Sequence, residues 1–199
     1  MAKKVDHELR KQEIARKALR LFSQVGYDNV SLIMIAAASA VPRTVMYRYF
    51  CSKREVMDAA IREVTGTIER RCQEVLKSRD STPSKLEKVC HAVVEEMFAH
   101  REFVIAVFDF VVGMVRSGAD MNAGIQEYTE GTRSAIKMLV AHGKRHGDFP
   151  QILDDARTTD ALYAEFESCA LRIVLNTEKN TVAAKQRFTD VIRAITAWT

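Results

Sequence analysis

Apolar residues recur every three or four positions through most of this sequence, and few residues interrupt that spacing. The 199 residues include only three Pro and eight Gly. Over residues 9–25, the spacing places Ile14, Ala18 and Leu21 on one helix face and Arg16 on another. Because 47% of the residues are apolar, the chain can bury a sizeable core. We therefore predict an all-α fold.

Positive charge is concentrated at the N-terminal end. Residues 1–54 hold eleven Lys and Arg against four Asp and Glu, which gives +7, whereas the whole chain carries +4. The remaining residues are therefore net negative by three. A basic module attached to a nearly neutral body is suited to meeting a polyanion, so we expect residues 1–54 to bind nucleic acid.

The basic segment also carries signals for three short helices. Gly26 ends the first helix, Ser31 is placed to cap a second over "LIMIAAA", and Pro42 favours the first turn of a third. At 100° per residue, the third helix, over residues 42–50, turns one set of residues inward and another outward. The inward set is Val45, Met46, Tyr49 and Phe50, and the outward set is Arg43, Thr44, Tyr47 and Arg48. A long helix capped by Ser52 follows, and this order predicts a helix-turn-helix.

The stretch "IARKALRLFSQVGYDNVSLIMIAAASAVPRTVMYRYFCSKREV" resembles the DNA-binding domain of TetR-type transcriptional repressors, over roughly residues 10–58. Its most specific elements are Leu21-Phe22, Gly26-Tyr27, Ile35-Ala36 and "YRYFCSKREV". The resemblance implies a three-helix DNA-binding domain at residues 1–54 and a helical effector-binding and dimerisation domain at residues 55–199. It also implies a ligand-responsive repressor rather than an enzyme.

The same resemblance assigns roles within the basic segment. The third helix would enter the major groove, where Arg43, Thr44 and Arg48 would face base edges. Ser31, Tyr47 and Lys53 would contact phosphates.

The turn between the second and third helices departs from the family pattern, in which Ala-Gly-Val-Ser is usual. Here Ala40 stands where glycine would allow a positive φ, and the strain is expected to cost about 1 kcal/mol. Pro42 and Val45 also replace residues whose hydroxyls commonly reach phosphate. We expect weaker DNA binding or a shifted set of contacts.

The rest of the chain predicts further helices, among them the apolar run "FVIAVFDFVVGMV", expected to be buried. Two more, over residues 155–175 and 182–198, carry apolar faces wider than a monomer core needs. Since similar proteins dimerise through their last two helices, we expect a homodimer on a palindromic operator. The expected interface residues are Leu162, Phe166, Cys169, Ile173, Phe188, Ile192 and Ile195.

The resemblance further implies a pocket for an unknown small-molecule effector in the C-terminal body. The residues expected near it are Phe98, Phe108, Asp109, Phe110, Met114, Tyr128 and Met138. Asp109 lies within an apolar run, so its carboxylate is expected either to pair with Arg116, Arg133 or a cationic ligand group, or to occupy an exposed corner.

Several classes of protein are not expected. The longest apolar run has thirteen residues, against roughly 20 needed to span a bilayer, and no signal peptide is present, so a cytoplasmic protein without membrane partners is expected. The sequence has no glycine-rich phosphate loop, HExxH, nucleophile elbow or CxxC, so no catalytic site and no cofactor are expected. Metal binding by His142 and His146 is not expected, and the cysteines are expected to be buried thiols, with a redox role for Cys51 as an alternative.

Two alternatives to an effector-responsive repressor remain open. The first is an architectural DNA binder without an effector, which the altered turn allows. The second is a helical ligand-binding protein with a degenerate DNA-binding head.

Overall fold

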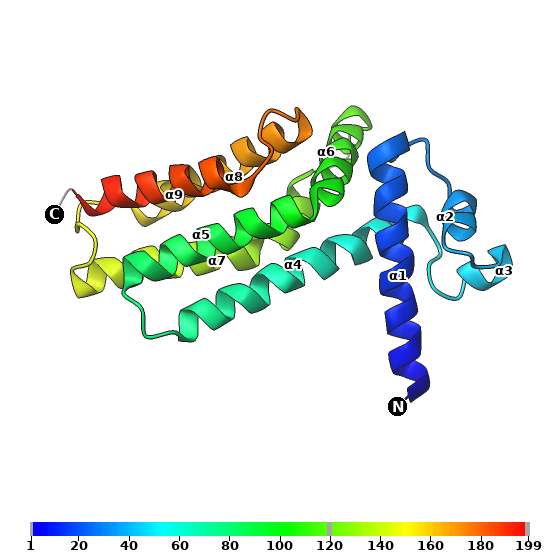
Figure 1. Ribbon diagram of the computed structural model, residues 1–199, viewed down its shortest axis with the longest axis horizontal. Helices are drawn as coiled ribbons and strands as arrows, with labels where there is room; N and C mark the ends of the chain where they lie inside the picture. Colours follow the sequence, from blue (N-terminus) through cyan, green and yellow to red (C-terminus); the bar gives the residue numbers. More distant parts are fainter. Residues whose placement is uncertain (1, 119–120, 198–199) are drawn as a thin grey trace. The chain divides into compact units, whose positions relative to one another are not determined.

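The computed structural model describes residues 2–118 and 121–197, with side chains described for residues 7–118 and 130–197. Within these residues the chain forms nine α-helices and no strand (Figure 1), which confirms the predicted all-α fold. The helices are α1 (Ala2–Val25), α2 (Leu32–Ala38), α3 (Arg43–Met46), α4 (Lys53–Lys77), α5 (Thr82–Ala99), α6 (Arg101–Arg116), α7 (Met121–His146), α8 (Asp155–Val174) and α9 (Thr181–Thr196). None of the described helices is long and apolar enough to cross a membrane.

The chain divides into two compact units. Unit 1 comprises Met1–Thr65 and Arg101–Ile125, and unit 2 comprises Gly66–His100 and Gln126–Thr199. This differs from the expected division after residue 54, because α6 packs along α1 and so belongs with the N-terminal helices. Unit 1 therefore includes a helix that lies about fifty residues downstream of the predicted boundary.

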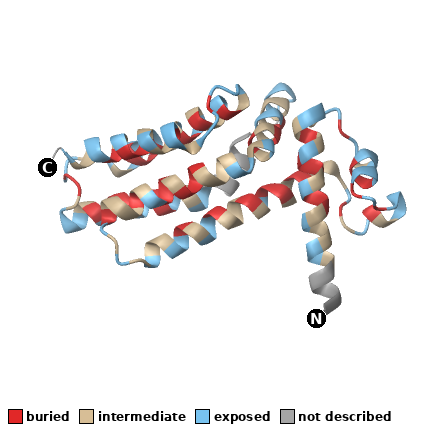
Figure 2. Cartoon of the chain, viewed as in Figure 1, coloured by how far each residue is buried: buried red, intermediate tan, exposed pale blue. Residues whose placement is uncertain are grey.

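The first three helices of unit 1 form as the sequence predicts, apart from the length of α3. The Ser31 hydroxyl oxygen accepts a hydrogen bond from the Met34 amide at 3.3 Å, which confirms the expected N-cap of α2. Regular α3 is shorter than the predicted 42–50, and the chain continues as turns in which Tyr49 and Phe50 donate to the Met46 carbonyl. The buried positions of these helices converge on one small core (Figure 2).

The start of α4 is capped by a reciprocal pair of side chains. The Ser52 hydroxyl oxygen accepts from the Glu55 amide at 3.2 Å, as predicted for the N-cap. The Glu55 carboxylate accepts in turn from the Cys51 amide at 2.9 Å. Because Glu55 bonds the amide of the residue before the N-cap, the pair resembles a capping box and stabilises the first turn of α4.

In unit 2, α5, α8 and α9 share one apolar core. The rings of Phe166 and Phe188 lie 4.5 Å apart between α8 and α9. Six of the seven residues expected at a dimer interface are buried within the single chain. They are Leu162, Phe166, Cys169, Ile173, Phe188 and Ile192, whereas Ile195 is half-buried. These six residues therefore form the core of unit 2, and a partner chain would have to meet other residues.

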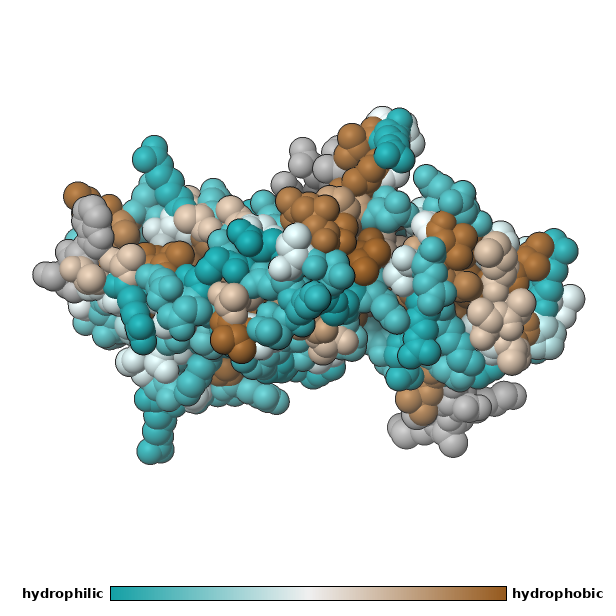
Figure 3. Space-filling view, turned by 45° about the horizontal axis from the view of Figure 1, so that its top comes forward, coloured by the Kyte–Doolittle hydropathy of each residue, from teal (hydrophilic) through white to brown (hydrophobic). Residues whose placement is uncertain are grey.

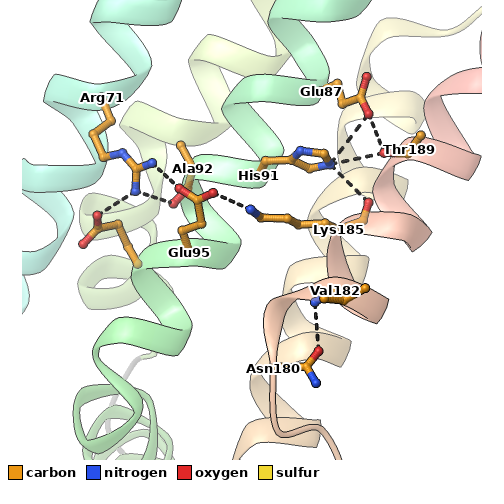
Figure 4. Close-up of polar contacts among 10 residues, drawn as sticks. Arg71, Glu87, His91, Ala92, Glu95, Asn180, Val182, Lys185 and Thr189 are labelled. Atoms are coloured by element: carbon orange, nitrogen blue, oxygen red, sulfur yellow. Dashed lines mark hydrogen bonds and ion pairs between the residues drawn. The ribbon is translucent and has the colours of Figure 1, made fainter.

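A polar network ties α9 to α5 and α4 (Figure 4). The carboxylate of Glu95 on α5 lies between Lys185 of α9 and Arg71 of α4, and Arg71 also donates to Glu96 at 2.8 Å. Lys185 first and Arg71 second hold the pKa of Glu95 below its ordinary value, because both donate hydrogen bonds to the charged carboxylate. Through this network the charge of Lys185 on α9 is paired with a carboxylate of α5.

The cysteines largely behave as expected. Cys72, Cys90 and Cys169 are buried, whereas Cys51 is exposed, and all four are free thiols. Burial raises the pKa of Cys72 and of Cys169 to about 11, so these thiols stay protonated and unreactive at neutral pH. No cluster of three or more His, Cys, Asp or Glu suited to a metal occurs among the described residues.

The apolar run on α6 is less buried than expected. Val104, Ala106 and Phe110 are buried, but Phe108 is 38% exposed and Val115 is 56% exposed. Apolar side chains also reach the surface elsewhere on the molecule (Figure 3).

Candidate nucleic-acid interface

The outward face of the third helix carries four exposed side chains. They are Arg43, Thr44, Tyr47 and Arg48, which we call the reading surface. On the opposite face Met46 and Phe50 are buried, and this division of faces is the one predicted. None of the four side chains has a hydrogen-bond or ion-pair partner among the residues whose side chains are described. Their guanidinium and hydroxyl groups are therefore available to an external partner.

The turn that precedes the reading surface is strained in the predicted way. Ala40 has φ of 51°, in the left-handed region that favours glycine. The Ser39 hydroxyl is buried and has no hydrogen-bond partner in the described structure. The turn is closed by a hydrogen bond of 2.9 Å from the Val41 amide to the Ala36 carbonyl. The turn therefore keeps its strained geometry with a backbone hydrogen bond across it and with a buried hydroxyl left unsatisfied.

The loop between α1 and α2 begins at Gly26, where a φ of 88° ends α1. Lys53, from the start of α4, donates to the Tyr27 carbonyl at 2.9 Å and to the Asp28 carbonyl at 3.1 Å. Its ammonium also lies 4.5 Å from the centroid of the Tyr27 ring. Two of the three Lys53 donors are thus used within the protein.

Helix α6 contacts the same loop from another side. The Asp109 carboxylate accepts a hydrogen bond of 2.6 Å from the Tyr27 amide, and the Phe110 ring meets the Tyr27 ring edge-on at 4.7 Å. Burial raises the pKa of the Tyr27 hydroxyl above its ordinary value. We call this set, Gly26, Tyr27, Lys53, Asp109 and Phe110, the loop junction. It joins α1, α4 and α6 at a single loop.

The loop junction settles which protein group pairs with Asp109. Its partner is the Tyr27 backbone amide rather than Arg116 or Arg133, and Asp109 is exposed, as the second of the two expectations had it. Arg133 pairs instead with Asp160 at 2.5 Å. A backbone amide can replace a charged partner because Asp109 is exposed and keeps its remaining oxygen in water.

Comparison with known proteins shows which family the helix-turn-helix segment matches. The family model described as bacterial regulatory proteins, tetR family, matches residues 14–60, which contain the reading surface and the α1–α2 loop. Residues 14–60 therefore match a TetR-type DNA-binding domain. The proteins that the chain resembles are DNA-binding transcriptional regulators.

Individual relatives match the regulator to different extents. It is 29% identical to the HTH-type transcriptional regulator HbdR of Aromatoleum sp. (strain CIB) over 58% of the chain, and this match spans only 48% of HbdR. It is 22% identical to the HTH-type nicotine-responsive transcriptional repressor HdnoR of Paenarthrobacter nicotinovorans, over 82% of each protein. The crystal structure of the transcriptional regulator FadR from Bacillus subtilis in complex with stearoyl-CoA matches with a TM-score of 0.79 at 17% identity, covering 94% of this chain and 98% of FadR.

The structure brings five of the six expected DNA-binding residues to the surface. Ser31 and the four residues of the reading surface are exposed, while Lys53 turns toward the α1–α2 loop. Their separate roles toward bases and phosphates remain predictions. The loop junction was not anticipated as a unit, because Tyr27 and Asp109 lie 82 positions apart in the sequence.

The expected effector residues are divided between the two units. Phe108, Asp109, Phe110 and Met114 lie on α6 in unit 1, whereas Phe98 and Met138 lie in unit 2. The Tyr128 side chain lies outside the described residues. Phe110 is buried against Tyr27 within the loop junction, and Met138 is exposed. Their role toward a ligand remains a prediction.

Proposed function

We propose that the regulator binds a palindromic operator as a homodimer and releases it when a small-molecule effector binds. The exposed reading surface carries this proposal, because two arginines with unpaired guanidinium groups can each donate to guanine O6 and N7. If the DNA-binding head were degenerate, we would not expect exposed arginines above an intact core. The reading surface therefore favours DNA recognition over the degenerate-head alternative.

Dimerisation is proposed through the outer faces of α8 and α9. Leu171 and Leu175 are 43% and 61% exposed, and Val174 shares their face at helical spacing. On α9, Val191 and Ile195 are half-buried one turn apart. These residues replace the buried set as the proposed contacts. Twofold pairing would place two reading surfaces about 34 to 36 Å apart, one turn of DNA.

The proposed effector is a small molecule whose binding acts on DNA through α6. Asp109 and Phe110 both touch the α1–α2 loop, so a shift of α6 would disturb the loop junction. An effector that binds the DNA-incompetent state more tightly opposes DNA binding, and DNA opposes the effector by the same factor. HdnoR is described as nicotine-responsive, and the FadR structure contains stearoyl-CoA. These two molecules are therefore suitable first probes.

Selection of random duplex DNA by the purified protein tests the proposal. We expect a palindromic consensus, bound with a steep dependence on salt, and a dimer by light scattering at micromolar concentration. Equal affinity for the winning and scrambled duplexes would favour an architectural DNA binder. Failure to bind any duplex at low salt would favour a degenerate head.

Release of the selected operator tests the effector. We expect stearoyl-CoA or nicotine to weaken operator binding at concentrations where free coenzyme A does not. Leu171→Glu with Leu175→Glu should separate the dimer and weaken operator binding, while Leu9→Glu, an exposed leucine on α1, should leave the oligomeric state unchanged.

A further inference from the structure

The N-terminal turns of α1 reach the helix-turn-helix through three side chains on one face. His7, Arg10 and Lys11 are spaced by three and four positions, which places them together on the helix. All three precede residue 14, where the match to the family model begins. The contacts they make therefore lie outside the part of the chain that the family model matches.

Each of the three side chains touches a different part of the helix-turn-helix. The His7 ring stacks on Tyr49 at 4.8 Å, with its Nε2 3.3 Å from the Arg48 carbonyl oxygen. Arg10 donates from Nη2 to the Ser39 carbonyl at 3.0 Å. The Lys11 ammonium lies 5.5 Å from the Phe50 ring centroid. A hydrogen bond from Nε2 to a carbonyl requires the proton on that nitrogen.

These contacts fall at the two places where the helix-turn-helix has the weakest local support, namely the left-handed turn and the end of the short α3. Arg10 bonds the residue that precedes Ala40, the left-handed position of the turn. His7 bonds the backbone just beyond Met46, where regular α3 ends after four residues. A helix of one turn gains little from its own hydrogen bonds, so neighbouring contacts set its orientation.

We propose that His7 and Arg10 are positioning residues for DNA readout. Arg10 holds the turn before the third helix, and His7 holds the backbone that carries the Arg48 side chain. Together they fix the direction in which Arg43 and Arg48 leave the protein surface. A bidentate contact with guanine depends on that direction, whereas a contact with phosphate depends mainly on charge. The inference rests on the proposed operator binding.

Affinity for the selected operator and for a scrambled duplex, measured on the full-length protein at several salt concentrations, tests this role. His7→Ala removes the ring, and Arg10→Lys keeps a positive charge while replacing the guanidinium. We expect each variant to lose about three- to tenfold in operator affinity, the range of one hydrogen bond, with little change toward the scrambled duplex. His7→Phe keeps an aromatic ring on Tyr49 and should recover part of the loss. Gln12→Ala, at an exposed position of the same helix, is the matched control and should behave as wild type.

The alternative outcomes separate this inference from the proposed function. If the wild-type protein selects no sequence, the proposed function and the inference both fail. If it selects an operator and the variants keep the wild-type ratio of affinities, the inference alone is wrong. Equal losses on both duplexes together with a lower melting temperature would assign His7 and Arg10 a purely structural role. For Arg10→Met, a salt dependence lower by about one unit would indicate a direct phosphate contact and would overturn the positioning role.

Discussion

The reading surface and the loop junction lie in the same unit and contain similar basic and aromatic side chains. Those of the reading surface are exposed to solvent, whereas those of the loop junction contact the protein itself. Arg48 on the reading surface extends into solvent, whereas Lys53, five positions later, donates to two backbone carbonyls. Tyr47 is exposed, while Tyr27 packs against Phe110. Basic and aromatic residue types therefore do not decide which positions meet DNA. Substitutions in the two regions should separate affinity from stability.

The largest effect is expected from Phe110→Ala in the loop junction. Phe110 is 5% exposed and packs on Tyr27, so its truncation should lower the free energy of unfolding by about 3 to 5 kcal/mol. Chemical denaturation followed by circular dichroism measures the loss. Phe108→Ala, on the same helix at a 38% exposed position, should cost much less. Equal losses for both variants would show that α6 does not anchor the loop.

Arg48→Ala on the reading surface should act on affinity alone. We expect affinity for the selected operator to fall by about 1 to 3 kcal/mol and base preference to relax at one position, with an unchanged melting temperature. Binding assays across operator variants give the measurement. Arg62→Ala removes an exposed arginine from α4 outside the reading surface and serves as the control. A lower melting temperature for Arg48→Ala would place this side chain among the structural contacts.

Lys53→Met distinguishes the two regions most directly. Because the ammonium bonds two carbonyls of the α1–α2 loop, the variant should lose about 1 to 2 kcal/mol of unfolding free energy. Thermal unfolding and a salt titration of DNA binding, made on the same samples, give both quantities. A salt dependence lower by about one unit, with no loss of stability, would instead restore the phosphate contact that family resemblance implies.

Ala40→Gly is expected to produce the smallest effect, and in the opposite direction. Glycine relieves the left-handed strain at φ of 51°, which should stabilise the protein by about 1 kcal/mol. The matched substitution Ala37→Gly, at an exposed helical position of α2, should destabilise it by a similar amount. If both glycine variants lose stability, the turn is held by its surroundings without measurable strain.

Local spacing predicted much of unit 1. The caps by Ser31 and Ser52 and the two faces of the third helix follow from neighbouring residues, whereas the left-handed Ala40 was expected from the family's turn pattern. The contacts of Lys53 could not be predicted in this way, because a long flexible side chain can reach either DNA or its own loop.

Contacts between distant segments were predicted least well. Nothing in a run of apolar residues specifies that Asp109 will cap the Tyr27 amide. The wide apolar faces of α8 and α9 were expected to meet a partner chain, yet most of their large residues are used by α5 and by each other. The spacing of apolar residues predicts which face of a helix must be buried, but it does not identify the element that packs against that face.

The bond between Asp109 and Tyr27 has a consequence for building hybrid regulators from this chain. A head exchanged at residue 54 would leave the Tyr27 amide without its acceptor and the Tyr27 ring without Phe110. The portable part is therefore discontinuous in sequence, and it consists of residues 1–65 together with α6. Chimeras that move both segments should keep the recognition specificity of this protein, whereas those cut at the helix-turn-helix boundary should lose solubility or DNA binding.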